Sequence, residues 1–283
     1  MRLFSLAAAG MAGMLTLSGC EKLTRPGVDK KLDPVNVIDA TNLNDIMLTV
    51  ADPNEAVDYF SNALQKEPTR TEFRRGLAQS LIRARRSSEA AQVYAELIRS
   101  GEASNEDRVN YADALIRTNE WKKAEAQLDK VPPTFETYKR YRLEAMIADS
   151  NKEWEKADSF YETAAGLTTR PAGVYNNWGF SKLTRGDYPE SERLFLQAIT
   201  YDKTLFTAKN NLVLARAAQR KYSLPVIPLT QIEKAELLHT LALSAIKQGD
   251  VEIGRGLLEE AIDTHPQYFD AAVRTLAALN SRI

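Results

Sequence analysis

The side chains that could carry out chemistry in this sequence are few and far apart. One cysteine, Cys20, and two histidines, His239 and His265, occur among the 283 residues, and their spacing fits neither a zinc site nor a nucleophile–base pair. Adjacent carboxylates such as Glu259 and Glu260 could act as a general acid and base, but solvated helix faces explain them more simply. The sequence also contains no glycine-rich phosphate loop and no nucleophile elbow. We therefore predict that the protein is not an enzyme and that it has no catalytic residues, no metal site, no cofactor and no small-molecule substrate.

Charge and composition argue against nucleic acid as a partner. Lysine and arginine total 37 and aspartate and glutamate total 38, which gives a formal net charge of −1. A nearly neutral chain lacks the positive surface that attracts phosphate backbones. With 44% hydrophobic and 27% charged residues, the composition instead predicts a folded protein.

The sequence around Cys20 has the layout of an export signal. In residues 1–19, the positive charge of Arg2 precedes an uncharged apolar run over residues 3–17, which is short of the roughly 20 residues that a membrane span needs. The run ends in Leu17-Ser18-Gly19-Cys20, which resembles the lipobox of bacterial lipoproteins. The resemblance implies that residues 1–19 are removed and that Cys20 is acylated. An ordinary signal peptide with a fortuitous cysteine is the alternative.

A lipidated Cys20 would attach the protein to a membrane without a transmembrane helix, because several acyl chains together make attachment effectively permanent. In lipoproteins of this kind, an aspartate directly after the cysteine tends to cause retention at the inner membrane, and Glu21 stands there instead. The resemblance therefore implies a lipid anchor at the periplasmic face of the outer membrane. Residues 20–36 are polar, contain Pro26 and Pro34, and are predicted to form a tether of roughly 20 to 25 Å.

Small residues recur in one local context along the rest of the chain, at spacings of 34, 34, 33, 34 and 63 residues. A bulky apolar residue follows each of them by four positions. A small side chain is needed where two helices cross closely, and a bulky one fills the space beside it. The pattern therefore predicts stacked helical hairpins. The small residues are Ala56, Ala90, Ala124, Ala157, Ser191 and Gly254, and the bulky ones are Phe60, Tyr94, Leu128, Tyr161, Phe195 and Leu258.

This pattern resembles the tetratricopeptide repeat, and residues 172–205 form its clearest copy, with Trp178-Gly179, Gly186-Asp187-Tyr188 and Phe195 at the motif positions. The resemblance implies an all-α fold, a right-handed α-solenoid of about six stacked hairpins over residues 37–283. Residues 206–234 depart from the pattern, because the two prolines of Leu224-Pro225-Val226-Ile227-Pro228 predict a loop or a broken second helix. Residues 268–279 are predicted to form a C-terminal capping helix.

Stacked repeats present a long groove, lined by the first helix of each hairpin, that suits an extended peptide or a partner helix. Asn176 and Asn210 are 34 residues apart, so their amides could bind the backbone of such a ligand; a purely local role for both is equally open. Carried over by position, the resemblance implies that fourteen residues line the groove: Arg75, Gln79, Ile82, Asp113, Arg142, Met146, Asn176, Phe180, Leu183, Asn210, Leu214, His239, Leu243 and Ile246.

The lipobox, the repeats and the proline-rich interruption together are most similar to the tetratricopeptide lipoprotein of tight-adherence (Flp) pilus systems. That similarity implies a pilotin-like scaffold whose partner is a secretin or another pilus assembly component. Two alternatives stay open. One is a type IV pilus pilotin, and the other is an envelope adaptor that recruits cell-wall hydrolases or proteases.

Overall fold

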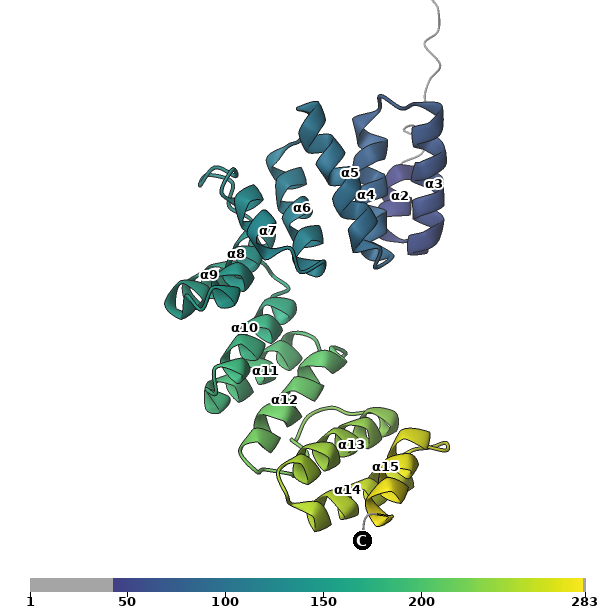
Figure 1. Cartoon of the computed structure of the whole chain (residues 1–283), viewed down its shortest axis with the longest axis vertical. Coiled ribbons are helices and arrows are strands. Elements are labelled where there is room, and N and C mark those ends of the chain that lie inside the picture. Colours follow the sequence, from purple (N-terminus) through teal and green to yellow (C-terminus); the bar gives the residue numbers. More distant parts are fainter. Residues whose placement is uncertain (1–42, 282–283) are drawn as a thin grey trace, which may run out of the picture. The chain divides into compact units, whose positions relative to one another are not determined.

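A computed structural model describes residues 43–281, and fourteen helices, α2 to α15, make up the regular structure there, with no strand in that range (Figure 1). The chain divides into two compact units, residues 1–43 and 44–283, and helices α3 to α15 all belong to the second. Cys20, the predicted signal and the predicted tether lie outside the described residues. None of the helices within 43–281 combines the length and the apolar character that crossing a membrane requires.

Most helices of this unit form hairpins of a first and a second helix, and each helix from α3 onward packs against the next one in the chain. First helices of successive hairpins also contact one another, as α4 with α6 and α8 with α10 do. The fold is thus the predicted all-α solenoid of stacked hairpins. The short helix α2 (Leu43–Thr49) buries no residue and precedes α3 (Pro53–Lys66), which packs against the first hairpin. The hairpins are α4 (Thr71–Arg83) with α5 (Ser87–Ser100), α6 (Asn105–Arg117) with α7 (Trp121–Leu128), α8 (Tyr138–Ser150) with α9 (Trp154–Gly166), α10 (Ala172–Thr184) with α11 (Tyr188–Tyr201), and α13 (Gln231–Lys247) with α14 (Val251–Thr264).

The recurring small residues lie where the two helices of a hairpin cross. Ala56, Ala90 and their counterparts are buried, and all six bulky residues four positions later are buried as well. At Gly179 a Cβ atom would lie 2.8 Å from the ring of Phe195, so the helices are already in contact there. The small–bulky pattern of the sequence is confirmed as the packing pattern of the core.

From the hairpin of α4 and α5 onward, the turn between the first and second helix contains a residue with positive φ. Gly186 and Gly249 supply it in two turns, but Arg85, Asn119 and Lys152 adopt the same left-handed conformation in three others, with φ between 61° and 65°. L-residues pay roughly 1–2 kcal/mol for this conformation. These turns therefore share one backbone conformation, even where glycine is missing.

The irregular unit consists of one helix, α12 (Phe206–Ala218), followed by residues 219–230 without helix, so the loop predicted from the two prolines is observed. Leu224 packs into the cores around Leu237 and Leu238, and Ile227 packs against the core of α11 and α12. The loop thus supplies the apolar side chains that a second helix would have supplied. Its tip, Val226, is fully exposed.

Helix α13 begins at Gln231, inside the segment 206–234 that the sequence pattern assigns to the irregular unit. Its first turn is capped by Thr230, whose hydroxyl accepts a hydrogen bond from the Glu233 amide while the Glu233 carboxylate accepts one from the Thr230 amide.

The C-terminal helix α15 (Asp270–Asn280) packs against α14. The predicted C-terminal cap is therefore present.

Candidate functional site

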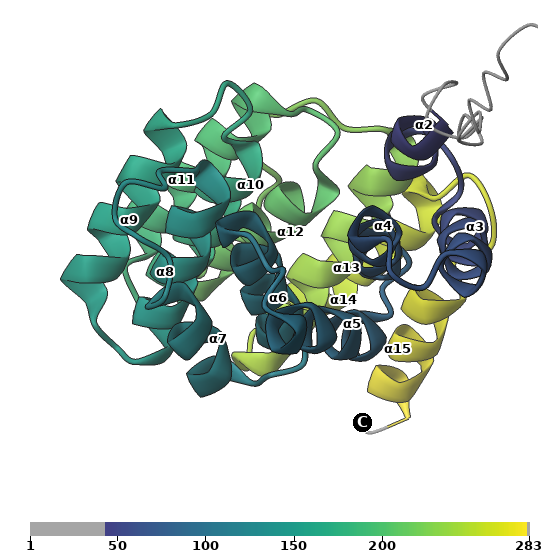
Figure 2. The same cartoon turned by 90° about the horizontal axis from the view of Figure 1, so that it is seen from above.

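A recess of about 510 Å³ opens in the middle of the array, where side chains of five helices converge. In this stretch, α8 and α10 lie on the inner side and α9 and α11 on the outer side (Figure 2). The recess is lined by Trp121 from α7, Met146, Asp149 and Ser150 from α8, Tyr161 from α9, Asn176, Asn177, Phe180, Ser181 and Thr184 from α10, and Thr207 and Asn211 from α12.

Helix periodicity places these residues on one face of each helix. Met146, Asp149 and Ser150 are three and four positions apart on α8, and the lining residues of α10 follow the same spacing from Asn176 to Thr184. The opposite face of α10, with Val174 and Gly179, is buried in the solenoid. Because one face of α10 packs in the core, its other face is available to line the recess.

Apolar groups form most of the recess wall. Phe180 is 50% exposed although it is large and apolar, and the half-buried Met146 lies near it in the same lining. The Met146 thioether accepts a hydrogen bond from the Asn177 amide at 3.4 Å. Tyr161 is buried, and its ring stacks on that of Trp178 with 6.2 Å between the centroids. The wall therefore offers aromatic and polarisable surface at a place that water reaches.

One carboxylate, Asp149, stands in this wall. Its two oxygens accept hydrogen bonds from the hydroxyls of Tyr161 at 2.9 Å and Ser181 at 2.6 Å. Burial raises the pKa of Asp149 above its usual value, although both hydrogen bonds and the charge of Arg185 act to lower it. Burial, together with the Asp149 charge, likewise raises the pKa of Tyr161 well above the usual value.

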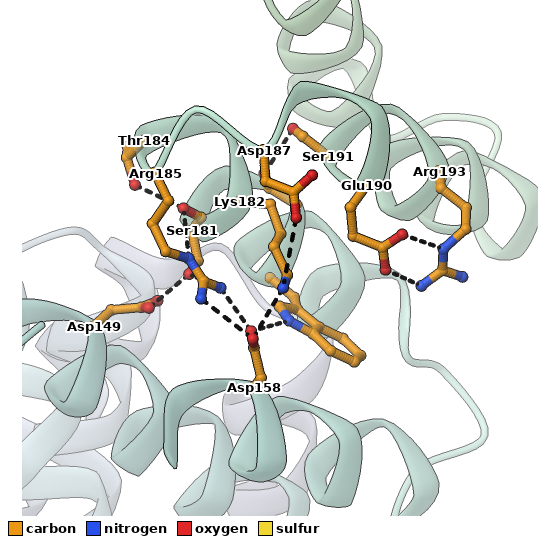
Figure 3. A network of polar contacts seen from close by, with 12 residues as sticks. Asp149, Asp158, Ser181, Lys182, Thr184, Arg185, Asp187, Glu190, Ser191 and Arg193 are labelled. Carbon is orange, nitrogen blue, oxygen red and sulfur yellow. Dashed lines mark hydrogen bonds and ion pairs between the residues drawn. The ribbon is translucent and has the colours of Figure 1, made fainter. Parts of the chain in front are cut away.

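The basic groups near Asp149 are engaged by a second carboxylate, Asp158 (Figure 3). Asp158 accepts hydrogen bonds from Arg185 at 2.6 Å, Lys182 at 2.9 Å and the Trp178 indole at 2.7 Å. Burial acts to raise the pKa of Asp158, but these hydrogen bonds outweigh it and the pKa is lowered. Within the described residues, Asp158 pairs with Arg185 and Lys182, Lys182 also lies 3.8 Å from Asp187, and Asp149 forms no ion pair of its own.

Amide groups occupy the side of the recess toward α12. The Asn176 carbonyl oxygen accepts a hydrogen bond from the Asn211 amide at 3.1 Å, which joins α10 to α12. Asn210, which the sequence paired with Asn176, instead accepts a hydrogen bond from Thr240 at 2.9 Å. The structure thus makes Asn211, one residue further along, the hydrogen-bond partner of Asn176, whereas Asn210 joins α12 to α13.

Three of the fourteen predicted groove residues, Met146, Asn176 and Phe180, meet in this recess. Several others are engaged in the solenoid itself. Arg75 pairs with Asp107 at 2.8 Å, and the buried Asp113 pairs with Lys139 at 3.0 Å. For these, a role in holding neighbouring hairpins together is visible, and contact with a partner stays a prediction.

The remaining predicted residues lie elsewhere on the array. Leu243 is exposed, whereas Ile82, Leu183 and Ile246 pack against core clusters. His239 faces Thr275 and the ring of Phe269. Gln79, Arg142 and Leu214 are half-buried on their helices. The structure does not bring these residues into one site.

Sequence reasoning missed most of the recess wall. Trp121 begins a second helix, where packing of the turn is the default explanation, so nothing in its position indicates a recess. Asn177 and Asn211 follow Asn176 and Asn210 by one position, and a shift by one residue turns a side chain by 100° around a helix. Asp149 carries a sequence signal, since it lies three residues after Met146 on the same helix face.

The geometry above agrees with comparisons to known proteins. Residues 48–107 match the tetratricopeptide repeat family. They include α3, α4 and α5, and the solenoid continues with the same hairpin geometry beyond them. Among curated proteins, none matches the sequence significantly.

Solved structures show the same tetratricopeptide-type fold along most of the chain. A chain of the APC/C hetero-tetramer Cut9–Hcn1 matches with a TM-score of 0.61 and 13% identity over 87% of this chain, and this chain spans half the length of that one. A chain of the human IFIT1 dimer with PPP-AAAA matches with a TM-score of 0.57 and 14% identity, over 81% of this chain and 59% of that one. A tetratricopeptide repeat protein from Parabacteroides merdae matches with a TM-score of 0.53 and 15% identity, over 86% of this chain and 98% of that one. At these identities the likeness concerns the fold.

Proposed function

We propose that this protein is a lipid-anchored tetratricopeptide scaffold of the outer membrane that binds a protein partner during pilus or secretion-system assembly. We further propose that it acts as a pilotin for the secretin of a tight-adherence (Flp) pilus. The observation that carries the binding role is the recess, where exposed Phe180 and half-buried Met146 lie beside the Asn176–Asn211 amide pair. Binding sites combine apolar surface with a few polar groups in this way, and the array provides no comparable support for a chemical step.

The membrane anchor is supported by the sequence Leu17-Ser18-Gly19-Cys20 and tested by one substitution. Cys20→Ser removes the thiol that would be acylated, so the variant should leave the membrane fraction and appear in the soluble periplasmic extract with its helical circular-dichroism spectrum intact. Separation of inner from outer membranes on a density gradient tests the role assigned to Glu21. Continued sedimentation of Cys20→Ser with membranes contradicts the lipid anchor.

The partner is tested by recovering complexes from detergent-solubilised membranes of cells that express the protein. A secretin should be enriched with the wild-type chain. Recovery of cell-wall hydrolases or proteases without a secretin contradicts the pilotin role and indicates an adaptor instead. Recovery of a type IV pilus secretin would indicate a pilotin of that pilus instead of the tight-adherence (Flp) pilus.

The recess is tested with a matched pair of substitutions. Phe180→Asp places a charge in the apolar wall and should lower recovery of the partner at least tenfold, since charged groups are costly in a desolvated contact. Leu196→Asp is the control, because Leu196 is 42% exposed against 50% for Phe180 but lies on α11 and does not line the recess. Equal recovery with both variants, both folded, contradicts the assignment of the recess as the binding site.

A further inference from the structure

The charge of the recess indicates what kind of group it accepts. Among the described residues of its wall, Asp149 is the one carboxylate, and lysine, arginine and histidine are absent. Aromatic rings from three helices, those of Trp121, Tyr161 and Phe180, share the wall with it. The recess is therefore both apolar and singly negative.

Asp149 keeps hydrogen-bonding capacity toward the recess. An ionised carboxylate has about four acceptor positions, and the described structure uses two of them, for the hydroxyls of Tyr161 and Ser181. No cation fills the others, because the guanidinium of Arg185 donates to Asp158 at 2.6 Å and reaches Ser181 rather than Asp149. The half-buried carboxylate is held in place by hydroxyls and has no ion-pair partner within the described residues. Figure 3 shows Ser181 bonded both to Asp149 and to Arg185.

We propose that the recess binds a basic side chain of the protein partner, an arginine or a lysine, with its aliphatic stem against Met146 and Phe180 and its cationic head at Asp149. This inference rests on the proposed partner-binding function and names the chemistry that the partner presents. Basic side chains have the required form, since they bury an apolar stem while the charged head pairs elsewhere.

Other occupants fit the wall less well. An acidic side chain would meet the negative charge of Asp149, and like charges in a partly desolvated site repel. A purely apolar side chain would cover Asp149 without pairing it, and burying an unpaired carboxylate is costly. A cation gains from Asp149 and from the faces of the aromatic rings together. Burial raises the pKa of Asp149 in the free protein, and a cation bound beside it would lower that pKa again.

Two small probes that differ in charge test this inference on the full-length chain in detergent. Benzamidine carries a positive amidinium group at neutral pH, and benzamide is its neutral isostere with the same ring. Titration of each probe, followed by the side-chain amide signals of Asn176, Asn177 and Asn211 in ¹⁵N-labelled protein, reports on the recess itself. We expect benzamidine to bind about tenfold more tightly than benzamide, in line with a charge-assisted hydrogen bond. Equal affinity of the two probes, or no response to either, overturns the inference.

Matched variants locate the charge that benzamidine recognises. Asp149→Asn keeps the shape of the side chain and should abolish the preference for benzamidine over benzamide. Asp187→Asn is the control, because Asp187 is an exposed carboxylate outside the recess wall whose ion-pair partner, Lys182 at 3.8 Å, keeps its closer contact with Asp158. This variant should leave the preference unchanged. Equal losses in the two variants indicate non-specific attraction and also overturn the inference.

The outcome is distinguishable from failure of the proposed function. If the partner is captured by the wild-type chain and lost with Phe180→Asp, but the probes show no charge preference, the scaffold function stands and the basic-side-chain inference falls. If the probes show the preference and no secretin is recovered, the recess chemistry stands and the pilotin role falls. An effect of Asp149→Asn on folding is excluded by comparing circular-dichroism melts, and the probe pair on the wild-type chain requires no variant.

Discussion

Gly254 and Gly256 lie two residues apart in α14 and meet different surroundings. A Cβ atom at Gly254 would lie 2.4 Å from Cγ1 of Ile246 and 3.0 Å from the carbonyl oxygen of Ala242, whereas a Cβ atom at Gly256 meets nothing within 4 Å. Gly254 therefore marks the close crossing of α13 and α14, and Gly256 faces open space. Side-chain size is constrained at the first position and free at the second.

Gly254→Ala should lower the free energy of unfolding by about 1 to 3 kcal/mol, because the added methyl group forces the two helices apart. Gly256→Ala should raise it by about 0.5 to 1 kcal/mol, since alanine loses less backbone entropy than glycine in a helix. Urea unfolding followed by circular dichroism measures both. A gain in stability with Gly254→Ala, as with Gly256→Ala, would mean that the crossing tolerates a methyl group.

Two buried serines differ in whether the hydroxyl has a partner. Ser80 is fully buried, and its hydroxyl forms no hydrogen bond within the described structure. The hydroxyl of Ser191, equally buried, donates to the carbonyl oxygen of Gly179 at 2.8 Å. A buried polar group without a partner costs free energy, whereas a satisfied one contributes a little.

Ser80→Ala should therefore stabilise the protein by about 1 kcal/mol, and Ser191→Ala should destabilise it by about 1 kcal/mol. The matched comparison removes the same hydroxyl from the same kind of helix crossing, so the sign of the change is the informative result. Thermal and urea unfolding of the two variants beside the wild-type chain provide the measurement. A loss of stability in Ser80→Ala would show that its hydroxyl is satisfied in solution.

At the scale of elements, a buried ion pair joins α12 to α13 where the array lacks a second helix. The ammonium of Lys209, 2% exposed as a residue, lies 2.7 Å from the carboxylate of Glu233. Burial acts to raise the pKa of Glu233, but the hydrogen bonds from Lys209 and the Thr230 amide outweigh it, so the pKa is lowered. The pair thus stabilises the folded state above the pKa that Glu233 has in the unfolded chain, and this contribution is lost as the pH falls through its lowered pKa.

Glu233→Gln should lower the free energy of unfolding at pH 7 by about 3 kcal/mol, because it leaves the buried ammonium of Lys209 unpaired. As the pH is lowered from about 5, the free energy of unfolding of the variant should also fall less than that of the wild-type chain, by roughly half as much, since the side chain at position 233 no longer titrates. Glu260→Gln is the control, because its pair with Lys234 is half exposed on both sides and contributes about 0 to 1 kcal/mol. Parallel pH profiles of Glu233→Gln and wild type would contradict this.

The elements themselves were largely predictable from side-chain size, whereas the recess was not. Small residues such as Ala90 and bulky ones such as Tyr94 report the helix crossings directly, because packing leaves little choice there. The polar run Asn151-Lys152-Glu153 also indicates a turn, although Lys152 adopts the left-handed backbone there without the usual glycine. The recess depends on how the faces of α8, α10 and α12 converge. The spacing of residues along any one helix does not predict how the three helices are placed.

At the scale of the whole unit, each hairpin is stabilised by the hairpins beside it. Helix α15 packs against α14 at the C-terminal end, and hairpins far apart in the chain share no principal contacts among the described helices. In such an array, stability is the sum of the units and of the interfaces between neighbours. Damage at one end should therefore remain near that end.

Deleting residues 270–283 should raise amide hydrogen exchange in α13 and α14 and leave exchange in α3, α4 and α5 unchanged. The deletion uncovers Leu258 and Ala261, which form a core with Ala272 of the removed helix. Exchange measured by mass spectrometry on the shortened and full-length chains gives the profile along the sequence. Uniform loss of protection over the whole chain would instead show that the array unfolds as one cooperative block.

Contacts that join only neighbouring hairpins also determine how the chain reaches its structure. Low contact order allows rapid folding, since no long loop must close before apolar surface is buried. The hairpin α4–α5 can pack against α6 as soon as this helix is synthesised, and the growing end offers each new hairpin a surface on which to pack. A polypeptide built in this way can fold progressively from its N-terminal side while the remainder is still unfolded.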